Sequence, residues 1–303
     1  MTTIKTIVAT GASSGLGFEL VRQLLTGSQP LYRYRLILGA RDVPRTQAAY
    51  DALGFDGTKH SLTILPLELS DLRTTRAFAR EALQRIGASA GQGEQGRLDY
   101  LLLNAGITNG VGEGPGPRGS RWCEALVVNH LSQHYLVHLL REKLVESYAR
   151  IVFVSSGAIR RVTETGSLEN DLKARSGVDA QTTYSQSKFV QLLGAHWWRR
   201  QLKGQCTVVA VSPGLIPNTG LGRGAGMKLT MDMPDAKTVP EGAQSILRAF
   251  TREDIPEDPE QIFLTSWGEW WPKDVYALTL DKALQDKWCP SKEEIERDEG
   301  LSA

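Results

Sequence analysis

An alternation of short apolar runs with longer amphipathic stretches extends along most of this chain. Such a rhythm is typical of strands and helices that wind over a parallel sheet. The run at 99–103 contains Tyr-Leu-Leu-Leu, which is too continuously apolar for a strand with one face in water. A glycine-rich turn also follows the first apolar run directly. These observations predict an α/β protein with a Rossmann-type, doubly wound and mostly parallel sheet, covered by helices on both faces.

Seven apolar runs are the candidate strands of this sheet. They occupy residues 4–9, 34–40, 62–67, 99–103, 151–155, 206–211 and 261–265. Three longer stretches between them are predicted to be helices, at 71–86, 121–148 and 181–202. No internal repeat or linker divides the chain. We therefore expect one domain over 1–266, followed by a C-terminal extension over 267–303.

Composition and charge exclude several classes of protein. The 303 residues carry 35 Lys and Arg against 34 Asp and Glu, so neither nucleic acid nor an anionic membrane is indicated as a partner. Three scattered cysteines predict neither a disulfide framework nor a metal site. No run approaches the ~20 apolar residues of a membrane span, and the N-terminus lacks a signal-like pattern. We expect a cytoplasmic protein.

The first strand candidate leads into Thr-Gly-Ala-Ser-Ser-Gly-Leu-Gly at 10–17, followed by a helix. Glycine permits a tight turn and lets the backbone approach a pyrophosphate, and a helix N-terminus offers free N–H groups to phosphate. The context of strand, glycine turn and helix makes this a specific dinucleotide signal. The predicted contacts are Gly11, Ser13, Ser14, Gly15, Leu16 and Gly17.

The end of the second strand candidate selects the cofactor. An acidic residue at this place would hold the ribose hydroxyls of NAD, whereas an arginine nearby accommodates the 2′-phosphate of NADP. Here Ala40 stands in the acidic place and Arg41 follows it. The sequence therefore favours NADP(H) over NAD(H). The alternative is that Arg41 is a solvated residue with Asp42 as its neutralising neighbour.

Tyr184 and Lys188 lie one helical turn apart, which places an ammonium beside a phenol. The chain resembles the short-chain dehydrogenase/reductase family over about 1–250, and several segments are similar to the branch of retinol dehydrogenases and protochlorophyllide reductases. The resemblance is carried, in the family's order, by the glycine turn, Asn104-Ala105-Gly106, Val128-Asn129-His130-Leu131, Ser155-Ser156, Tyr184 to Lys188, Ser212-Pro213-Gly214 and Thr219-Gly220-Leu221.

The resemblance implies four catalytic residues. Tyr184 exchanges a proton with the substrate oxygen, Lys188 favours its phenolate, and Ser156 orients the substrate. Asn129 holds a water chain that leads to Lys188. Of the serine pair, Ser156 is the choice and Ser155 the alternative.

The resemblance also implies further cofactor contacts along the strand ends. They are Glu68 and Leu69 at the adenine, Asn104, Ala105 and Gly106, then Pro213, Gly214 and Ile216. Glu68 stands where the family often has Asp, and Asp71 lies nearby. The family's threonine falls at Asn218 here, with Thr219 next, so either residue can meet the nicotinamide.

Other features each allow a functional and a structural interpretation. His130, His134 and His138 have a spacing that suits a metal, but no carboxylate or cysteine completes a site, so packing is favoured. Arg160 and Arg161 form either a receptor for an anionic substrate group or, as favoured, a solvated pair. Four tryptophans near the C-terminus either line a substrate pocket or, as favoured, pack the extension against the rest of the protein. They are Trp267, Trp270, Trp271 and Trp288. The charged stretch 292–299 indicates an exposed helix face.

Together these residues predict an NADPH-dependent ketone reductase that can also act as a secondary alcohol dehydrogenase. The substrate loops are expected at about 157–181 and 214–237, with the extension packed on or near the substrate side. A long insertion and the tryptophans favour a bulky ketone or alcohol as the substrate. A homodimer is possible, although the extension can block it. The alternatives are a non-catalytic NADP(H) sensor or scaffold, and an enzyme recruited to another step of specialised metabolism.

Overall fold

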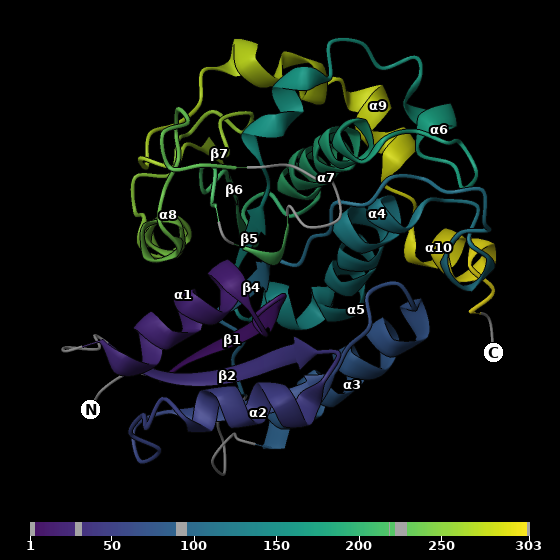
Figure 1. The fold of residues 1–303 in the computed structure, drawn as a ribbon. Coiled ribbons are helices and arrows are strands. Elements are labelled where there is room, and N and C mark those ends of the chain that lie inside the picture. Colours follow the sequence, from purple (N-terminus) through teal and green to yellow (C-terminus); the bar gives the residue numbers. More distant parts are fainter. Residues whose placement is uncertain (1–3, 28–31, 89–95, 218, 222–228, 302–303) are drawn as a thin grey trace.

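Seven parallel strands form one sheet in the order β3-β2-β1-β4-β5-β6-β7 (Figure 1). This computed structural model describes residues 4–27, 32–88, 96–217, 219–221 and 229–301. The strands are β1 (Ile4–Thr10), β2 (Arg33–Ala40), β3 (Ser61–Pro66), β4 (Tyr100–Leu103), β5 (Arg150–Val154), β6 (Thr207–Val211) and β7 (Phe263–Leu264). The strand order reverses between β1 and β4, where a doubly wound sheet opens its ligand crevice. The predicted fold class is confirmed.

Side chains along each central strand alternate between two separate apolar cores, which explains the continuous apolar runs. In β5, Ile151 and Phe153 enter one core, whereas Val152 and Val154 enter the other. Both faces of the sheet are therefore buried, as expected for parallel strands.

Helices cover the two faces in equal measure. One face carries α1 (Gly15–Thr26), α2 (Val43–Asp51) and α8 (Val239–Thr251), and the other carries α3 (Leu72–Ala88), α5 (Ser132–Glu146) and α7 (Ala180–Gln201). Shorter helical segments are η1 (Pro117–Gly119), α4 (Glu124–Leu126), η2 (Val127–Leu131), η3 (Gly157–Arg161), α6 (Leu168–Asp171), η5 (Lys273–Leu280), α9 (Lys282–Trp288) and α10 (Lys292–Asp298).

Two predicted elements differ from those observed. The strand expected at 261–265 is only the two-residue β7, because it pairs with β6 along one short stretch at the sheet edge. The helix expected at 121–148 begins at Glu124 and is not uniform: α4, the π-helical turn η2 and α5 follow one another. Such π-turns add a residue to a helical turn and are frequent at functional sites.

The C-terminal extension lies against the two long helices, with α9 on α7 and α10 on α5 (Figure 1). The buried histidines of α5 and η2 help to hold it. His130 Nε2 lies 2.8 Å from the carbonyl oxygen of Trp288, and His134 Nε2 lies 2.9 Å from that of Pro290. Burial lowers the pKa of His130 to about 4, so the ring is neutral at physiological pH. The histidines therefore act in packing, the interpretation that the sequence favoured.

The charged stretch of the extension does more than expose a charged face, so the sequence interpretation was incomplete. Glu296 accepts a 2.7 Å hydrogen bond from the buried Tyr135 hydroxyl, and Glu299 accepts one of 3.0 Å from Ser120. Ile295 is buried in a small apolar cluster that includes Tyr135. These contacts fix α10 to the domain through polar groups that a helical pattern alone does not reveal.

The tryptophans of the extension mostly pack within the protein. Trp288 meets Trp122 at 5.4 Å between ring centroids, and Trp271 stacks on Phe263 at 6.0 Å. Trp267 is an exception to this packing, because 56% of its surface is exposed to solvent.

Candidate active site

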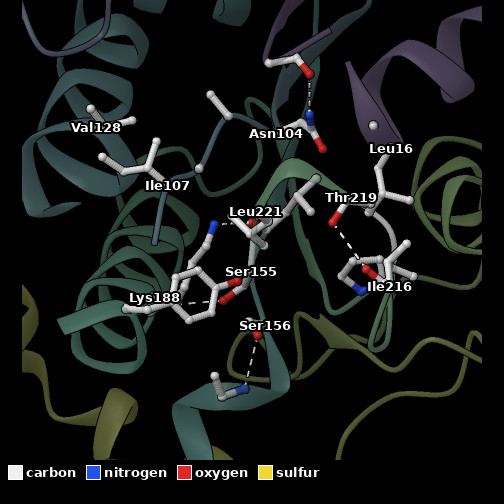
Figure 2. A pocket seen from close by; sticks show the side chains of 18 of the residues that line it. Leu16, Asn104, Ile107, Val128, Ser155, Ser156, Lys188, Ile216, Thr219 and Leu221 are labelled. Atoms are coloured by element: carbon white, nitrogen blue, oxygen red, sulfur yellow. Dashed lines mark hydrogen bonds between the residues drawn. The ribbon is translucent and has the colours of Figure 1, made fainter. Parts of the chain in front are cut away.

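A cavity of about 560 Å³ opens at the carboxyl ends of the central strands. Loops that follow β1 to β6 supply its walls, so residues far apart in sequence meet there. Nearly all the predicted site residues line it: Gly11, Ser13, Ser14, Gly15, Leu16, Arg41, Glu68, Leu69, Asn104, Ala105, Gly106, Ser156, Tyr184, Lys188, Pro213, Gly214, Ile216 and Thr219. Gly17 and Asn129 are the two predicted site residues that do not line the cavity. Figure 2 shows Lys188, Ser155 and Ser156 gathered on one side and Leu16, Ile216 and Thr219 on the other.

The glycine turn has a shape that larger residues would not permit. Gly11 and Gly15 have positive φ angles of 66° and 54°, a backbone region that favours glycine. A Cβ on Gly17 would come within 2.2 Å of the Gly11 carbonyl oxygen. Gly17 therefore acts by allowing α1 to approach the turn closely, which explains why it does not line the cavity.

The first turn of α1 is suited to an anion. Its N-cap residue, Ser14, makes no side-chain capping bond, so the orphan N–H groups of this turn face the cavity without a protein oxygen from the cap. Asn104 braces the turn, because its Nδ2 donates to the Gly11 carbonyl oxygen at 2.8 Å. These features fit a phosphate-bearing cofactor at the sheet's switch point.

Arg41 lies exposed at the cavity edge, at the end of β2. Asp42, the neighbour that could neutralise it, accepts a hydrogen bond from the Arg45 backbone N–H at 3.0 Å and so caps α2. Within the ranges that the structure describes, Arg41 forms no ion pair. Its guanidinium thus remains available to a phosphate.

The structure separates the two acids that follow β3. Glu68 lines the cavity and accepts a 3.1 Å hydrogen bond from the Ser70 backbone N–H. Asp71 is buried outside it, with Arg118 at 3.0 Å.

Tyr184 lies near the start of α7 and is only 8% exposed. Asp179 caps this helix through the backbone N–H groups of Gln181 and Thr182, which fixes the turn that carries Tyr184. Burial raises the pKa of Tyr184, and a hydrogen bond with the Ser156 side chain acts against this rise. A proton is therefore held firmly on the phenol near neutral pH, as an acid that protonates an alkoxide requires. Ser155 instead directs its hydroxyl at the Lys188 carbonyl oxygen, 3.5 Å away.

Lys188 is 3% exposed, and its ammonium is held by two oxygens. Nζ donates to the Val154 carbonyl oxygen at 2.9 Å and to the Gln191 Oε1 at 3.1 Å. Burial lowers the pKa of Lys188 to about 7, since neither partner carries a charge. Gln191 is not among the site residues predicted from the sequence. The signal was available, because Gln191 follows Lys188 by three residues on one helix face.

Asn129 lies in the π-helical turn η2 and is fully buried. Its Oδ1 accepts from the Ile107 N–H at 2.8 Å, and its Nδ2 donates to the Ile107 carbonyl oxygen at 3.0 Å and the Ser187 hydroxyl at 2.9 Å. Asn129 therefore joins the loop after β4 to α7 behind the cavity. Its predicted water chain stays a prediction.

The loop after β6 closes the other side of the cavity. Gly214 has a φ of +93°, which turns the chain after Pro213, and Ile216 is buried against the wall. The Thr219 hydroxyl donates to the Ile216 carbonyl oxygen at 3.2 Å. Asn218, the alternative to Thr219, lies outside the described residues.

Apolar side chains that were not predicted from the sequence also line the cavity. They include Ile107, Val128, Leu215, Leu221 and Leu229. Single apolar residues in loops carry no periodic signal, so only the folded chain identifies them. Arg160 and Arg161 are exposed, as a solvated pair would be, but both also line the cavity.

Comparisons of sequence identify the relatives of this chain. The family profile described as short chain dehydrogenase matches residues 5–168. A short-chain dehydrogenase/reductase from Pestalotiopsis microspora is 60% identical over 295 residues, which cover 96% of this chain and 98% of that protein. Retinol dehydrogenase 14 from Mus musculus is 34% identical over 233 residues, covering 72% of this chain but only 63% of that protein.

A comparison of structures agrees on the fold. The crystal structure of the NADPH-bound carbonyl reductase from chicken fatty liver aligns with a TM-score of 0.65 and 21% identity. The alignment covers 89% of this chain and 99% of that one. In the described ranges of this chain, none of the helices has the length and apolar character that crossing a bilayer requires.

Proposed function

Because this chain belongs to the short-chain dehydrogenase/reductase family of oxidoreductases, we propose that it is an NADPH-dependent ketone reductase that also runs in reverse on secondary alcohols. The observation that carries this proposal is one shared cavity. Tyr184, Ser156 and Lys188 line it together with the glycine turn of a dinucleotide site. Arg41 at its edge, with no acidic residue at the end of β2, supports NADP(H) over NAD(H).

The residues of this chain divide the reaction between them. When bound, the reduced nicotinamide supplies the hydride to the carbonyl carbon. Ser156 donates a hydrogen bond to the carbonyl oxygen and fixes its place, while Tyr184 gives its proton to that oxygen as negative charge develops there. Lys188, charged, stabilises the phenolate that Tyr184 leaves behind. In the reverse direction, the Tyr184 phenolate accepts the alcohol proton.

The residues that line the cavity indicate which side chains and backbone groups would hold the cofactor. The glycine turn and the N-terminus of α1 would hold the pyrophosphate. Arg41 would bind the 2′-phosphate, and Glu68 and Leu69 would contact the adenine. Pro213, Ile216 and Thr219 would flank the nicotinamide.

A substrate panel tests the proposed reaction. We expect purified protein to oxidise NADPH with bulky aryl and alicyclic ketones or quinones, because several apolar side chains line the cavity that holds Tyr184. The loss of NADPH absorbance as the cofactor is oxidised is the readout. Turnover with small aldehydes alone would contradict a bulky substrate. Tight NADPH binding without turnover of any carbonyl or alcohol would favour the sensor, and a product other than the alcohol would favour another step of specialised metabolism.

Gln191 gives a test of the Lys188 environment. Its oxygen stabilises the charged ammonium, so Gln191→Leu should lower the pKa of Lys188 further. The alkaline limb of the kcat/KM profile for ketone reduction should then move to lower pH by about one unit, since a hydrogen bond to a charged group contributes about 1.5–3 kcal/mol. Gln191→Glu should move that limb to higher pH.

A neighbouring glutamine provides the control for this pH shift. Gln186 lies on the same helix and is 7% exposed, but its Nε2 donates to Asp171 and it does not line the cavity. Gln186→Leu should leave the pH limb in place. An unmoved limb in both Gln191 variants would show that Lys188 does not set it.

Two further expectations stay predictions. We place the reaction in the cytoplasm, which is supported by three buried and unpaired cysteines, Cys123, Cys206 and Cys289. A homodimer through the long helices would have to accommodate α9 and α10, which pack on α7 and α5.

A further inference from the structure

We propose that Arg161 forms a subsite for an anionic group, and that the substrate is therefore a bulky ketone that carries a carboxylate or a phenolate. This inference rests on the proposed ketone reduction and adds the substrate class. Arg161 follows Ser156 by five residues, at the end of η3, and lines the same cavity as Tyr184. A substrate held at Ser156 thus shares one cavity with Arg161.

The guanidinium of Arg161 is held in place by a neutral group. In the amide orientation that satisfies both polar atoms of Gln181, its oxygen accepts from the two terminal nitrogens of Arg161 at 3.0 and 2.5 Å. Gln181 lies in the first turn of α7, three residues before Tyr184. The arginine is therefore oriented by the helix that carries the acid, and in the described part of the chain it forms no ion pair, although Glu164 lines a smaller neighbouring cavity together with Arg161 and Gln181.

Arg160, its neighbour, is engaged differently. Its Nε donates to the Gly157 carbonyl oxygen at 3.0 Å, and its guanidinium lies over the Trp271 ring at 5.2 Å from the centroid. Stacking on Trp271 fixes the plane of the Arg160 guanidinium at the ring. Arg161 is stacked on no ring in the described part of the chain, and the donors that Gln181 does not use remain for a ligand, so we take Arg161 as the candidate.

In the described part of the chain, none of the acidic groups on the cavity wall forms an ion pair with Arg161. Glu124 accepts from the Asn109 amide at 2.9 Å, and Asp235 accepts from the Ser266 hydroxyl at 2.5 Å. Glu68 lies at the end of β3, on the adenine side of the proposed cofactor site. Apolar side chains such as Ile107 and Val128 line the same cavity. An apolar body with one acidic group matches this distribution, because buried apolar area supplies affinity and one fixed charge supplies orientation.

Matched ketones test the subsite. An acetylnaphthoate, its methyl ester and an acetylnaphthol share one ring system and one ketone, but differ in charge. We expect the wild-type protein to show a lower KM for the carboxylate than for the ester. Arg161→Gln should raise the KM for the carboxylate about tenfold to a hundredfold and leave that for the ester nearly unchanged. Arg161→Lys should restore part of the loss, since it keeps the charge but not the planar fork. Calorimetric binding of the acetylnaphthol, compared below and above its phenol pKa with the ester as the control for pH, distinguishes a phenolate ligand from a carboxylate ligand.

A binding measurement separates this inference from the proposed function. Naphthalene dicarboxylate has no ketone, so calorimetric titration of the NADPH-loaded protein reports on the subsite without turnover. Its affinity should fall in Arg161→Gln and persist in Arg80→Gln, an exposed arginine outside the cavity. If binding follows this pattern but no ketone is reduced, the subsite stands and the proposed reaction fails. If the ketones are reduced with equal KM for ester and carboxylate, and Arg161→Gln changes neither, the subsite is refuted while the reaction stands.

Discussion

Tyr184→Phe should lower ketone turnover by about a hundredfold to ten-thousandfold, the range that a positioned general acid contributes. The substitution removes one oxygen and keeps the ring, which is almost fully buried, so the surrounding packing should survive. Without the hydroxyl, no acid at this place can protonate the developing alkoxide. The measurement is kcat for an aryl ketone, together with NADPH affinity from fluorescence titration, which should change by less than about threefold because Tyr184 mainly serves the substrate oxygen.

A second tyrosine provides the matched control. Tyr135 is also buried, and its hydroxyl donates to Glu296 at 2.7 Å, but it does not line the cavity. Tyr135→Phe should therefore cost some stability through the lost hydrogen bond and leave kcat close to that of the wild type. Near-normal turnover of Tyr184→Phe would remove Tyr184 from the role of acid and would shift attention to Ser156 or a bound water.

Arg41→Asp should reverse the choice of cofactor. The wild-type guanidinium can form two charge-assisted hydrogen bonds with a 2′-phosphate, and a carboxylate at the same place would repel that phosphate while accepting from ribose hydroxyls. We expect the KM for NADPH to rise on the order of a hundredfold, given about 1.5–3 kcal/mol for each bond to a charged group. The KM for NADH should stay similar or fall. The ratio of kcat/KM values for the two cofactors is the measurement.

The same charge change at a distant site controls for a general electrostatic effect. Arg80 is exposed on α3 and does not line the cavity, so Arg80→Asp should leave the cofactor ratio unchanged. Arg41→Lys should give an intermediate ratio, because an ammonium retains the charge but loses the bidentate geometry. An unaltered ratio in Arg41→Asp would exclude Arg41 from the cofactor site.

The sequence was sufficient for the strands because each central strand is apolar on both faces. That property is local, and it predicted β1 to β6 to within one or two residues. The prediction was less accurate at β7, where pairing with β6 along a short edge decides the length of the strand. The long helix was also predicted only in outline, since the π-helical turn at Val127–Leu131 depends on how Asn129 meets the loop at Ile107.

The residues of the candidate site also differ in how far the sequence alone could predict them. Glycines with positive φ, and the Tyr184 and Lys188 pair one turn apart, follow rules that act over a few residues, so the chain itself carried their signal. Gln191 followed the same helical rule, but its value became visible only when its oxygen was found 3.1 Å from the Lys188 ammonium. The spacing indicated that Gln191 and Lys188 could be in contact. Because both side chains are buried, this contact affects the pKa of the ammonium.

The sequence by itself determined the sheet, the glycine turn and the acid beside its ammonium, because strand apolarity, turn geometry and helix periodicity are local properties. Only the tertiary structure decided that Arg161 lines the cavity, that the histidines hold the extension, and which apolar side chains line the cavity with Tyr184. These depend on contacts between segments distant along the chain, where burial and the local field are set by the whole fold rather than by neighbouring residues.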